Sequence, residues 1–308
     1  MPFRETTDRA GPVNRRTETT PNASAGRTRG IASTPAFPAP LGTTASFAPA
    51  SPADSSAAAE ETYNLRLLDR SRERWETSAQ LREVYGSIYR DMARHATPGP
   101  AIEIGSGAGT IKEFLPEVVT SDIRRTRYVD EVASAYALDD VARAPWSTIY
   151  ALDVLHHLRE PFRFFASAAQ ALRPGGRIVV CDPAASFWGR WFYRSFHREP
   201  TNPDRVQTPY EFAPDSPLGD FANMGMAWAL FVRDREVVAA SLARMGLSIQ
   251  AVRFRDCLAY AASGGFSGPK LLPVSWLRRL LALEQRTPQA LLRLFGLRLV
   301  VVLERATP

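Results

Sequence analysis

The sequence predicts a doubly wound α/β fold, in which helices cover both faces of a mostly parallel sheet. Strand and helix patterns alternate between residues 100 and 183, as parallel strands joined by helical crossovers require. A glycine-rich turn directly follows the first short apolar run. The chain has 308 residues and is 45% hydrophobic, which is enough for a sizeable core.

The first 58 residues have a different composition from the rest of the chain. Residues 1–58 are rich in Ser, Thr, Ala, Pro and Gly and show no helical or strand period, so we predict a disordered tail. An overcalled start codon is an alternative explanation. From Thr62 onward apolar residues recur at helical intervals, which predicts one or two amphipathic helices over residues 59–98. The main domain then spans residues 99–308.

The main domain alternates between strands and helices up to Pro183 and becomes less regular afterwards. Strands are expected within 100–107, 117–123, 147–158, 177–183, 247–261 and 297–305. Helices are expected within 109–116, 160–176 and 234–246, and the polar stretch 124–146 is expected to be partly helical. Two inserts remain: an aromatic and arginine-rich insert at 184–232, and an amphipathic helical insert at 264–296.

Composition narrows the functional classes. The net charge of +6 indicates either attraction to acidic surfaces or an ordinary solubilising surface, and the second is the simpler explanation. Cys181 and Cys257 are the only cysteines, and no Cys/His spacing predicts a disulfide framework or a metal site. No apolar run is long enough to span a bilayer, and no apolar stretch follows Arg15 and Arg16. We therefore expect a cytoplasmic protein.

The main chemical signal is the loop Glu103-Ile-Gly-Ser-Gly-Ala-Gly109, between a predicted strand and a helix. Its glycines allow a tight turn and a close approach of a ligand to the backbone. A dinucleotide fingerprint requires a further glycine where Thr110 stands, so a ligand with an amino acid part fits better. Asp122, at the end of the second predicted strand, is placed to accept hydrogen bonds from ribose hydroxyls, although it could be a solvated turn residue.

Three segments resemble the class I S-adenosylmethionine (SAM)-dependent methyltransferases, in particular the type 11 domain group. They are EIGSGAG, the stretch ALDVLHHLREPFRFFASAAQALRPGGRIVV, and the final strand. The resemblance implies a Rossmann-like seven-stranded sheet with an antiparallel last strand, and SAM as the cofactor. It assigns SAM binding to Glu103, Gly105, Ser106, Gly107, Gly109, Asp122 and Ile123, and places Leu152 and Asp153 along the methionine part.

Two positions depart from the family pattern. Ser134 stands where an adenine-contacting acid is expected, with Asp130, Asp139 and Asp140 close by, and Thr148 replaces an aspartate at the start of the fourth strand. The residues that contact adenine therefore stay open.

On the acceptor side, His156 and Asp182 follow two predicted neighbouring strands, whose carboxyl ends meet at one edge. We hypothesise that His156 is a general base oriented by Asp182. Equally, one of His156 and His157 could cap a helix while the other packs. The predicted reaction is methylation of a small-molecule, glycan or lipid-linked acceptor, on oxygen. N- or C-methylation and a non-catalytic SAM-binding interaction protein are the alternatives, and Thr110 disfavours a nucleotide-dependent oxidoreductase.

The aromatic insert and the amphipathic insert bear on partners. The aromatic insert interleaves Phe187, Trp188, Trp191, Phe192, Tyr193 and Phe196 with Arg190, Arg194 and Arg198. This pattern fits a lid for a lipid-like acceptor and peripheral contact with the inner face of a membrane. It also fits a plain cover for the sheet or a dimer contact, which is the simpler explanation. No signature of nucleobase methylation is present, so no nucleic-acid partner is expected, and the oligomeric state is left open.

Overall fold

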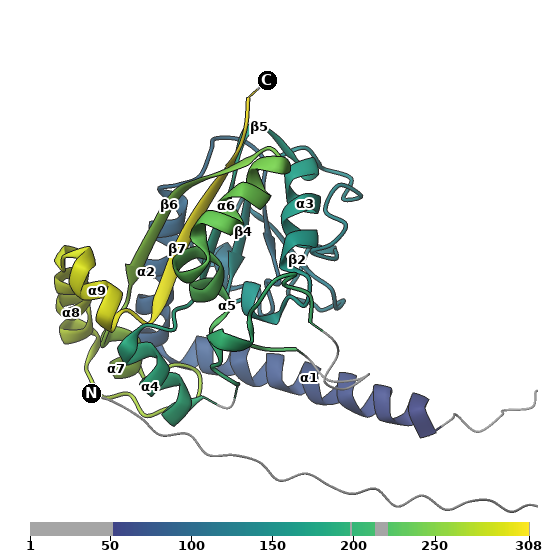
Figure 1. The fold of residues 1–308 in the computed structure, drawn as a ribbon. Helices are drawn as coiled ribbons and strands as arrows, with labels where there is room; N and C mark the ends of the chain where they lie inside the picture. Colours follow the sequence, from purple (N-terminus) through teal and green to yellow (C-terminus); the bar gives the residue numbers. More distant parts are fainter. Residues whose placement is uncertain (1–51, 198, 213–220, 308) are drawn as a thin grey trace, which may run out of the picture. The chain divides into compact units, whose positions relative to one another are not determined.

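A seven-stranded sheet forms the centre of the protein (Figure 1). The computed structural model describes residues 52–197, 199–212 and 221–307, with side chains from residue 65 onward. The strands are β1 (Ala101–Ile104), β2 (Val119–Asp122), β3 (Glu131–Val132), β4 (Trp146–Leu152), β5 (Leu172–Pro183), β6 (Leu247–Arg255) and β7 (Arg298–Arg305). They lie in the order β3-β2-β1-β4-β5-β7-β6. Strands β1 to β5 pair in parallel, and β7 is antiparallel to both β5 and β6. The predicted fold class is confirmed.

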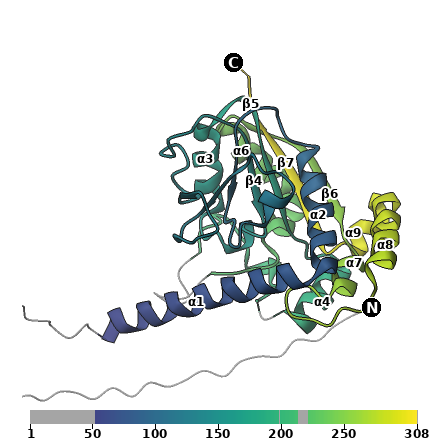
Figure 2. The same ribbon diagram turned by 180° about the vertical axis from the view of Figure 1, so that it is seen from behind.

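Helices cover both faces of this sheet (Figure 2). The longer helices are α1 (Pro52–Thr77), α2 (Ala79–Ala93), α3 (Pro161–Ala171), α4 (Phe187–Phe196), α6 (Arg235–Arg244), α8 (Val274–Arg286) and α9 (Gln289–Phe295). Shorter turns of helix are η1 (Thr110–Glu113), η2 (Leu155–His157), η3 (Pro203–Arg205), α5 (Met226–Trp228), η4 (Ala229–Arg233) and α7 (Ala259–Ser263). These elements divide the interior into two cores, one on each side of the sheet.

Strand β4 shows how one sequence serves both cores. All seven of its residues are buried, as expected of a parallel strand covered on both faces. Ile149 packs in the core that contains the inner face of α3 and α6, whereas Tyr150 packs in the core that contains α2 and α8. Successive side chains of a strand point to opposite faces, so the alternation follows from β geometry.

Three local predictions differ from the structure. Helix α1 begins at Pro52, inside the predicted tail, because Pro suits a first helical turn and the alanine-rich run after it favours helix. The rest of that tail, residues 1–51, lies outside the described residues. Residues 109–116 form only the 3-10 turn η1, since Pro116 stops the helix. The stretch 124–146 contains β3 and turns and no helix, because it lacks a continuous apolar face.

Strand ends also differ by a few residues. The stretch 147–158 ends as strand at Leu152 and continues as the turn η2, and the stretch 247–261 ends as strand at Arg255 before α7. The two inserts contain α4, η3, α5 and η4 in the first, and α8 and α9 in the second. Within the described residues, no helix is both long enough and apolar enough to cross a membrane.

Candidate functional site

The glycine loop after β1 has the geometry that its sequence suggests. Gly105, Gly107 and Gly109 have φ angles of 59°, 50° and 65°, in the left-handed region that glycine adopts without strain. A Cβ on Gly105 would lie 2.6 Å from a methyl group of Val154, and a Cβ on Gly109 would lie 2.4 Å from the carbonyl oxygen of Tyr128. The bare backbone is therefore a steric requirement at both positions.

Side chains of the loop and of β2 hold the turn in place. The amide of Gly107 donates to Asp122 Oδ2 at 3.1 Å, so the carboxylate at the end of β2 faces the loop. Ser106 donates from its amide to the Ser121 carbonyl at 2.8 Å, and its hydroxyl bridges Glu103 and Ser121. The structure thus brings Asp122 and the loop together as predicted. Ser106 is occupied with backbone contacts.

Glu103 is a buried carboxyl on β1, with only 2% of its surface exposed. Its Oε1 accepts a hydrogen bond from the Tyr89 hydroxyl at 3.1 Å, whereas Oε2 has no hydrogen-bond partner among the residues that the structure describes. Burial raises the pKa of Glu103 to about 7, against which the hydrogen bond from Tyr89 acts. An unpartnered, buried carboxylate oxygen at the base of the loop is available to a cationic ligand group.

Two further residues predicted to bind the cofactor, Ile123 and Leu152, lie at this edge of the sheet, the first exposed and the second buried. Ile123, directly after Asp122, leaves 67% of its side chain exposed, which is unusual for an isoleucine and offers an apolar surface to a ligand. Leu152 closes β4 and is buried. Among the open candidates for adenine contact, Asp130 already accepts from Thr120 and pairs with Lys112, with Nζ–O at 2.6 Å.

Asp153 has a structural task that the sequence does not reveal. Its backbone has a φ of 57°, and its carboxylate accepts from the Tyr85 hydroxyl at 3.0 Å and pairs with the buried Arg298. Although burial opposes ionisation, the nearby charge of Arg298 lowers the pKa of Asp153. Arg298 and Tyr85 come from β7 and α2, so only the folded structure brings them to the end of β4.

Helix α1 lies over the glycine loop. Its Leu68 side chain is the group nearest to a Cβ built on Gly107, at 3.4 Å, and Arg72 Nη1 donates to the Ala108 carbonyl at 3.3 Å. Trp75, fully buried, donates from Nε1 to Glu113 at 2.6 Å. The helix that precedes the sheet therefore forms one wall of the candidate cofactor site.

At the carboxyl ends of β4 and β5, the structure brings His156 and Asp182 together. His156 Nδ1 lies 3.0 Å from Asp182 Oδ1, and both residues are buried. The second ring nitrogen, Nε2, lies 3.6 Å from Glu199 Oε2, a residue of the aromatic insert. Burial alone would lower the pKa of His156, but the charge of Asp182 and the contacts with both carboxyl groups raise it to about 10.

His157 completes this cluster. Its Nδ1 lies 3.0 Å from the Phe221 carbonyl, and its Nε2 lies 4.0 Å from Glu199 Oε1. Contact with His156 lowers the pKa of Glu199 to about 2. Sequence reasoning missed Glu199, because it lies in an irregular segment after α4 and carries no motif.

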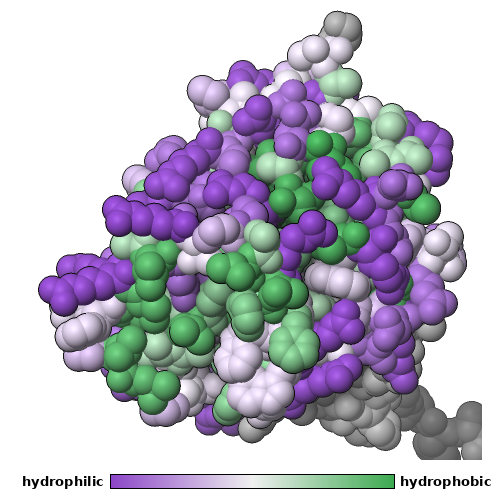
Figure 3. All heavy atoms as spheres, turned by 60° about the vertical axis from the view of Figure 1, so that its left-hand side comes forward, coloured by the Kyte–Doolittle hydropathy of each residue, from purple (hydrophilic) through white to green (hydrophobic). Residues whose placement is uncertain are grey.

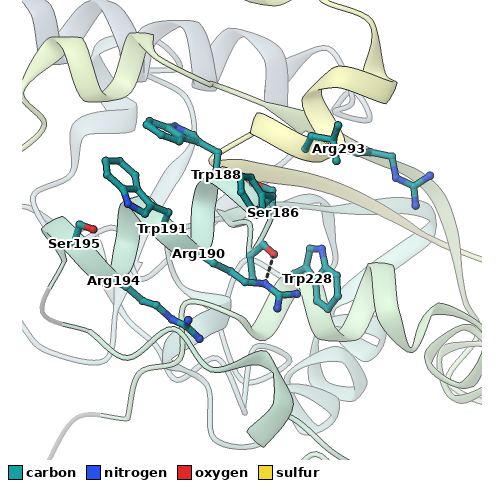
Figure 4. Close-up of a pocket in the computed structure, with 11 residues that line it drawn as sticks. Ser186, Trp188, Arg190, Trp191, Arg194, Ser195, Trp228 and Arg293 are labelled. Carbon is teal, nitrogen blue, oxygen red and sulfur yellow. Dashed lines mark hydrogen bonds between the residues drawn. The ribbon is translucent and has the colours of Figure 1, made fainter.

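One cavity lies at α4 (Figure 4). It measures about 750 Å³ and is lined by Ala185, Ser186, Phe187, Trp188, Arg190, Trp191, Arg194, Ser195, Trp228, Arg293 and Leu294. The rings of Trp188 and Trp191 stack with centroids 4.5 Å apart, and Arg190 lies over the Trp228 ring. The predicted aromatic insert therefore lines a real cavity. Arg198, predicted to belong to the same pattern, lies outside the described residues.

Known proteins provide a family assignment and distant structural similarities. A family model described as a methyltransferase domain matches residues 78–237. A SAM-dependent methyltransferase from Archaeoglobus fulgidus is 13% identical, with 73% of this chain and 94% of that chain covered and a TM-score of 0.44. A possible histamine N-methyltransferase from Thermotoga maritima is 17% identical, with 76% and 94% covered and a TM-score of 0.43.

A third similar structure contains ligands. It is the 1,6-didemethyltoxoflavin-N1-methyltransferase of Burkholderia thailandensis with 1,6-didemethyltoxoflavin and S-adenosylhomocysteine, 15% identical, with 88% and 94% covered and a TM-score of 0.40. Similarities at this level say nothing about the acceptor of this chain. No curated protein sequence matches the chain.

Proposed function

The chain belongs to the SAM-dependent methyltransferase family, because the family match covers more than half of its 308 residues, and from this premise we propose that it methylates a hydroxyl group of an apolar or lipid-linked acceptor. In this reaction the acceptor oxygen attacks the methyl carbon of SAM. The carbon–sulfur bond breaks, its electron pair stays on sulfur, and S-adenosylhomocysteine leaves. The hydroxyl proton passes to a base or to solvent.

The observation that carries the cofactor site is the meeting of three features at one edge of the sheet. These are the left-handed glycine turn, the unpartnered oxygen of Glu103, and the carboxylate of Asp122 on the neighbouring strand. We assign the ribose to Asp122, the methionine ammonium to the Glu103 side of the loop, and the adenine to the exposed face of Ile123. Leu152 and Asp153 then border the methionine part, and the backbone of Ser106 faces it.

Calorimetry with SAM tests this assignment. The Asp122→Asn variant keeps an oxygen for the Gly107 amide but loses the charged acceptor for two ribose hydroxyls, so we expect at least tenfold weaker SAM binding. NAD should produce no heat with the wild-type chain. If Asp122→Asn binds SAM as tightly as the wild type, the ribose assignment is wrong.

On the acceptor side, we propose that the reacting oxygen enters beside His156. Asp182 fixes the tautomer of His156 and leaves Nε2 to face the acceptor. An imidazole with a pKa of about 10 is protonated at neutral pH, so the base role requires the acceptor to displace Glu199 from Nε2. The His156→Gln variant should lose turnover and keep SAM affinity. Unchanged turnover would exclude any chemical role for this side chain.

We further propose that the acceptor is reached at an anionic membrane surface, because the second insert has an exposed apolar face. Figure 3 views the molecule from the side of α8 and α9 and shows apolar side chains gathered there, bordered by polar ones. The exposed apolar residues of this face, which we call the α8/α9 face, are Leu271, Trp276, Leu283, Leu291, Leu294 and Phe295.

The charges of the α8/α9 face favour anionic lipid over a neutral partner. Residues 274–295 contain one acid, Glu284, which is only 7% exposed and accepts hydrogen bonds from the amides of Leu258 and Ala259. Arg279, Arg286 and Arg293 belong to the same helices. Exposed apolar rings and uncompensated arginines together suit binding at an anionic lipid surface.

Flotation with phosphatidylglycerol vesicles tests the membrane proposal. The double variant Trp276→Ser/Leu283→Ser removes two side chains that are 58% and 64% exposed, so we expect binding at least tenfold weaker without loss of fold. The matched control is Val237→Ser, which is 55% exposed on α6, away from this face. Absence of vesicle binding by the wild-type chain would remove the membrane part of the proposal and leave the cofactor site untouched.

A further inference from the structure

We propose that His156, His157 and Glu199 form a binding site for one divalent transition-metal ion. One ring nitrogen of each histidine and one carboxylate oxygen of Glu199 all lie within 4.8 Å of one another. Two histidines and one carboxylate are a common ligand set for Zn²⁺ and Fe²⁺, since imidazole nitrogen and carboxylate oxygen both suit these ions.

The second hydrogen bond of each imidazole supports this assignment. His156 Nδ1 lies 3.0 Å from the carboxylate of Asp182, and His157 Nδ1 lies 3.0 Å from the carbonyl of Phe221. Both acceptors hold a proton on Nδ1, so Nε2 is the nitrogen through which each imidazole would bind an ion, which on His156 displaces the Nε2 proton. Metal-binding histidines in proteins almost always have such an outer oxygen partner, a carboxylate or a backbone carbonyl.

The Nε2 atoms of the two neighbouring imidazoles, whose ring centroids are 4.1 Å apart, both approach the carboxylate of Glu199. Glu199 presents Oε2 to His156 at 3.6 Å and Oε1 to His157 at 4.0 Å. These separations are longer than hydrogen bonds and leave room between the atoms for an ion at about 2.0–2.2 Å from each. Two carboxylates, those of Asp182 and Glu199, also bring negative charge to the two imidazoles, which a cation balances.

The position of the cluster is suited to an open metal site. The side chain of His156 is only 4% exposed, whereas those of His157 and Glu199 are 40% and 38% exposed. One side of the cluster is therefore held rigidly by the sheet edge, and the other is open to solvent and to an acceptor. An ion here would hold the acceptor oxygen and lower the pKa of its hydroxyl, and His156 would then act as a metal ligand in place of a base; this role rests on the proposed function.

Binding of Co²⁺ to the untagged full-length chain, after treatment with a chelator, tests the site. Co²⁺ reports its ligands through its visible absorption, and Zn²⁺ should displace it. We expect one Co²⁺ per chain in the wild type and at least tenfold weaker binding in His157→Ala and in Glu199→Ala, both partly exposed residues. His95→Ala is the control, because His95 lies outside the cluster and should leave binding unchanged.

Two outcomes would overturn the proposal. One is the absence of stoichiometric Co²⁺ binding by the wild type. The other is that His157→Ala and Glu199→Ala bind Co²⁺ as tightly as the wild type does. SAM calorimetry on the metal-free chain separates this inference from the proposed function, since the glycine loop and Asp122 do not belong to the cluster. SAM binding without Co²⁺ binding removes only the metal site.

Discussion

Gly109 combines a left-handed backbone with a blocked side-chain direction, which makes its substitution informative. In Gly109→Ala, the left-handed backbone with a φ of 65° is strained, and the new Cβ would lie 2.4 Å from the carbonyl oxygen of Tyr128. Because both effects destabilise the folded state, we expect a loss of about 2–4 kcal/mol in the free energy of unfolding. Gly246→Ala is the matched control, because Gly246 has a φ of 72° but nothing within 4 Å of a Cβ. There the loss should be about 1 kcal/mol. Urea unfolding measures both, and equal losses would show that the close approach has no cost.

Glu103 predicts a pH dependence of SAM binding. With a pKa of about 7, its carboxyl is protonated below neutral pH, and a ligand ammonium that needs the charge must first displace the proton. SAM affinity should therefore fall as the pH decreases, by about tenfold from pH 8 to pH 6. Calorimetry at both values checks this prediction.

The Glu103→Gln variant is the control for that titration, because it removes the titrating group and keeps the shape of the side chain. We expect its weaker SAM affinity to change little between pH 6 and pH 8. If the variant keeps the wild-type pH dependence, another group titrates and Glu103 does not meet the ammonium.

Among the elements, α4 depends on a single cap. Ser186 is 2% exposed, accepts from the Gly189 amide at 2.9 Å and donates to the Gly296 carbonyl at 2.7 Å, so it begins α4 and ties it to the end of α9. Ser186→Ala should lower the free energy of unfolding by about 1–3 kcal/mol, since it leaves two backbone groups without a partner. Ser248→Ala, at an exposed position on β6, should change it by less than about 0.5 kcal/mol. Similar losses in both variants would contradict the capping role.

The elements also show which parts of the fold are encoded locally. The central strands could be predicted because each is a short apolar run that ends at a glycine, an aspartate or a proline, and the alternating pattern of parallel strands follows. The start of α1 and the stretch 124–146 could not. In the first, helix propensity of a polar, alanine-rich run outweighs its disorder-like composition, and in the second a polar composition conceals the two-residue strand β3.

The site divides in the same way. The glycine loop, Asp122, and the pair His156 and Asp182 were predictable, because they follow strands whose order the pattern determines. Glu199 and Arg298 were not. Each reaches the site only through long-range packing, Glu199 from an irregular insert and Arg298 from the register of β7 against β5 and β6. No periodicity in the sequence records that register.

At the scale of the whole molecule, Arg298 joins four elements at the carboxyl edge of the sheet. It is 3% exposed and pairs with Asp153, which follows β4. Its Nη2 donates a hydrogen bond to the Tyr85 hydroxyl of α2 at 3.2 Å, and its Nε lies 3.8 Å from Oδ2 of Asp256, which follows β6. Its guanidinium also lies over the rings of Tyr85 and Tyr260. Because α2 and the ends of β4 and β6 meet at this one cation, the network holds the candidate methionine site to the rest of the fold.

Removing this cation should therefore be costly, and the cost should depend on the charges left behind. Arg298→Met leaves the partly buried Asp153 without its counter-ion, and we expect a loss of up to about 3–5 kcal/mol in the free energy of unfolding. Arg177→Met, the control on the neighbouring strand, breaks a pair with Glu304 that is 33% and 30% exposed and should cost at most about 1 kcal/mol. Adding Asp153→Asn to Arg298→Met should restore part of the loss, because the uncompensated charge is gone. Losses that simply add in this double-mutant cycle, measured by urea unfolding, would mean that the two residues are not energetically coupled.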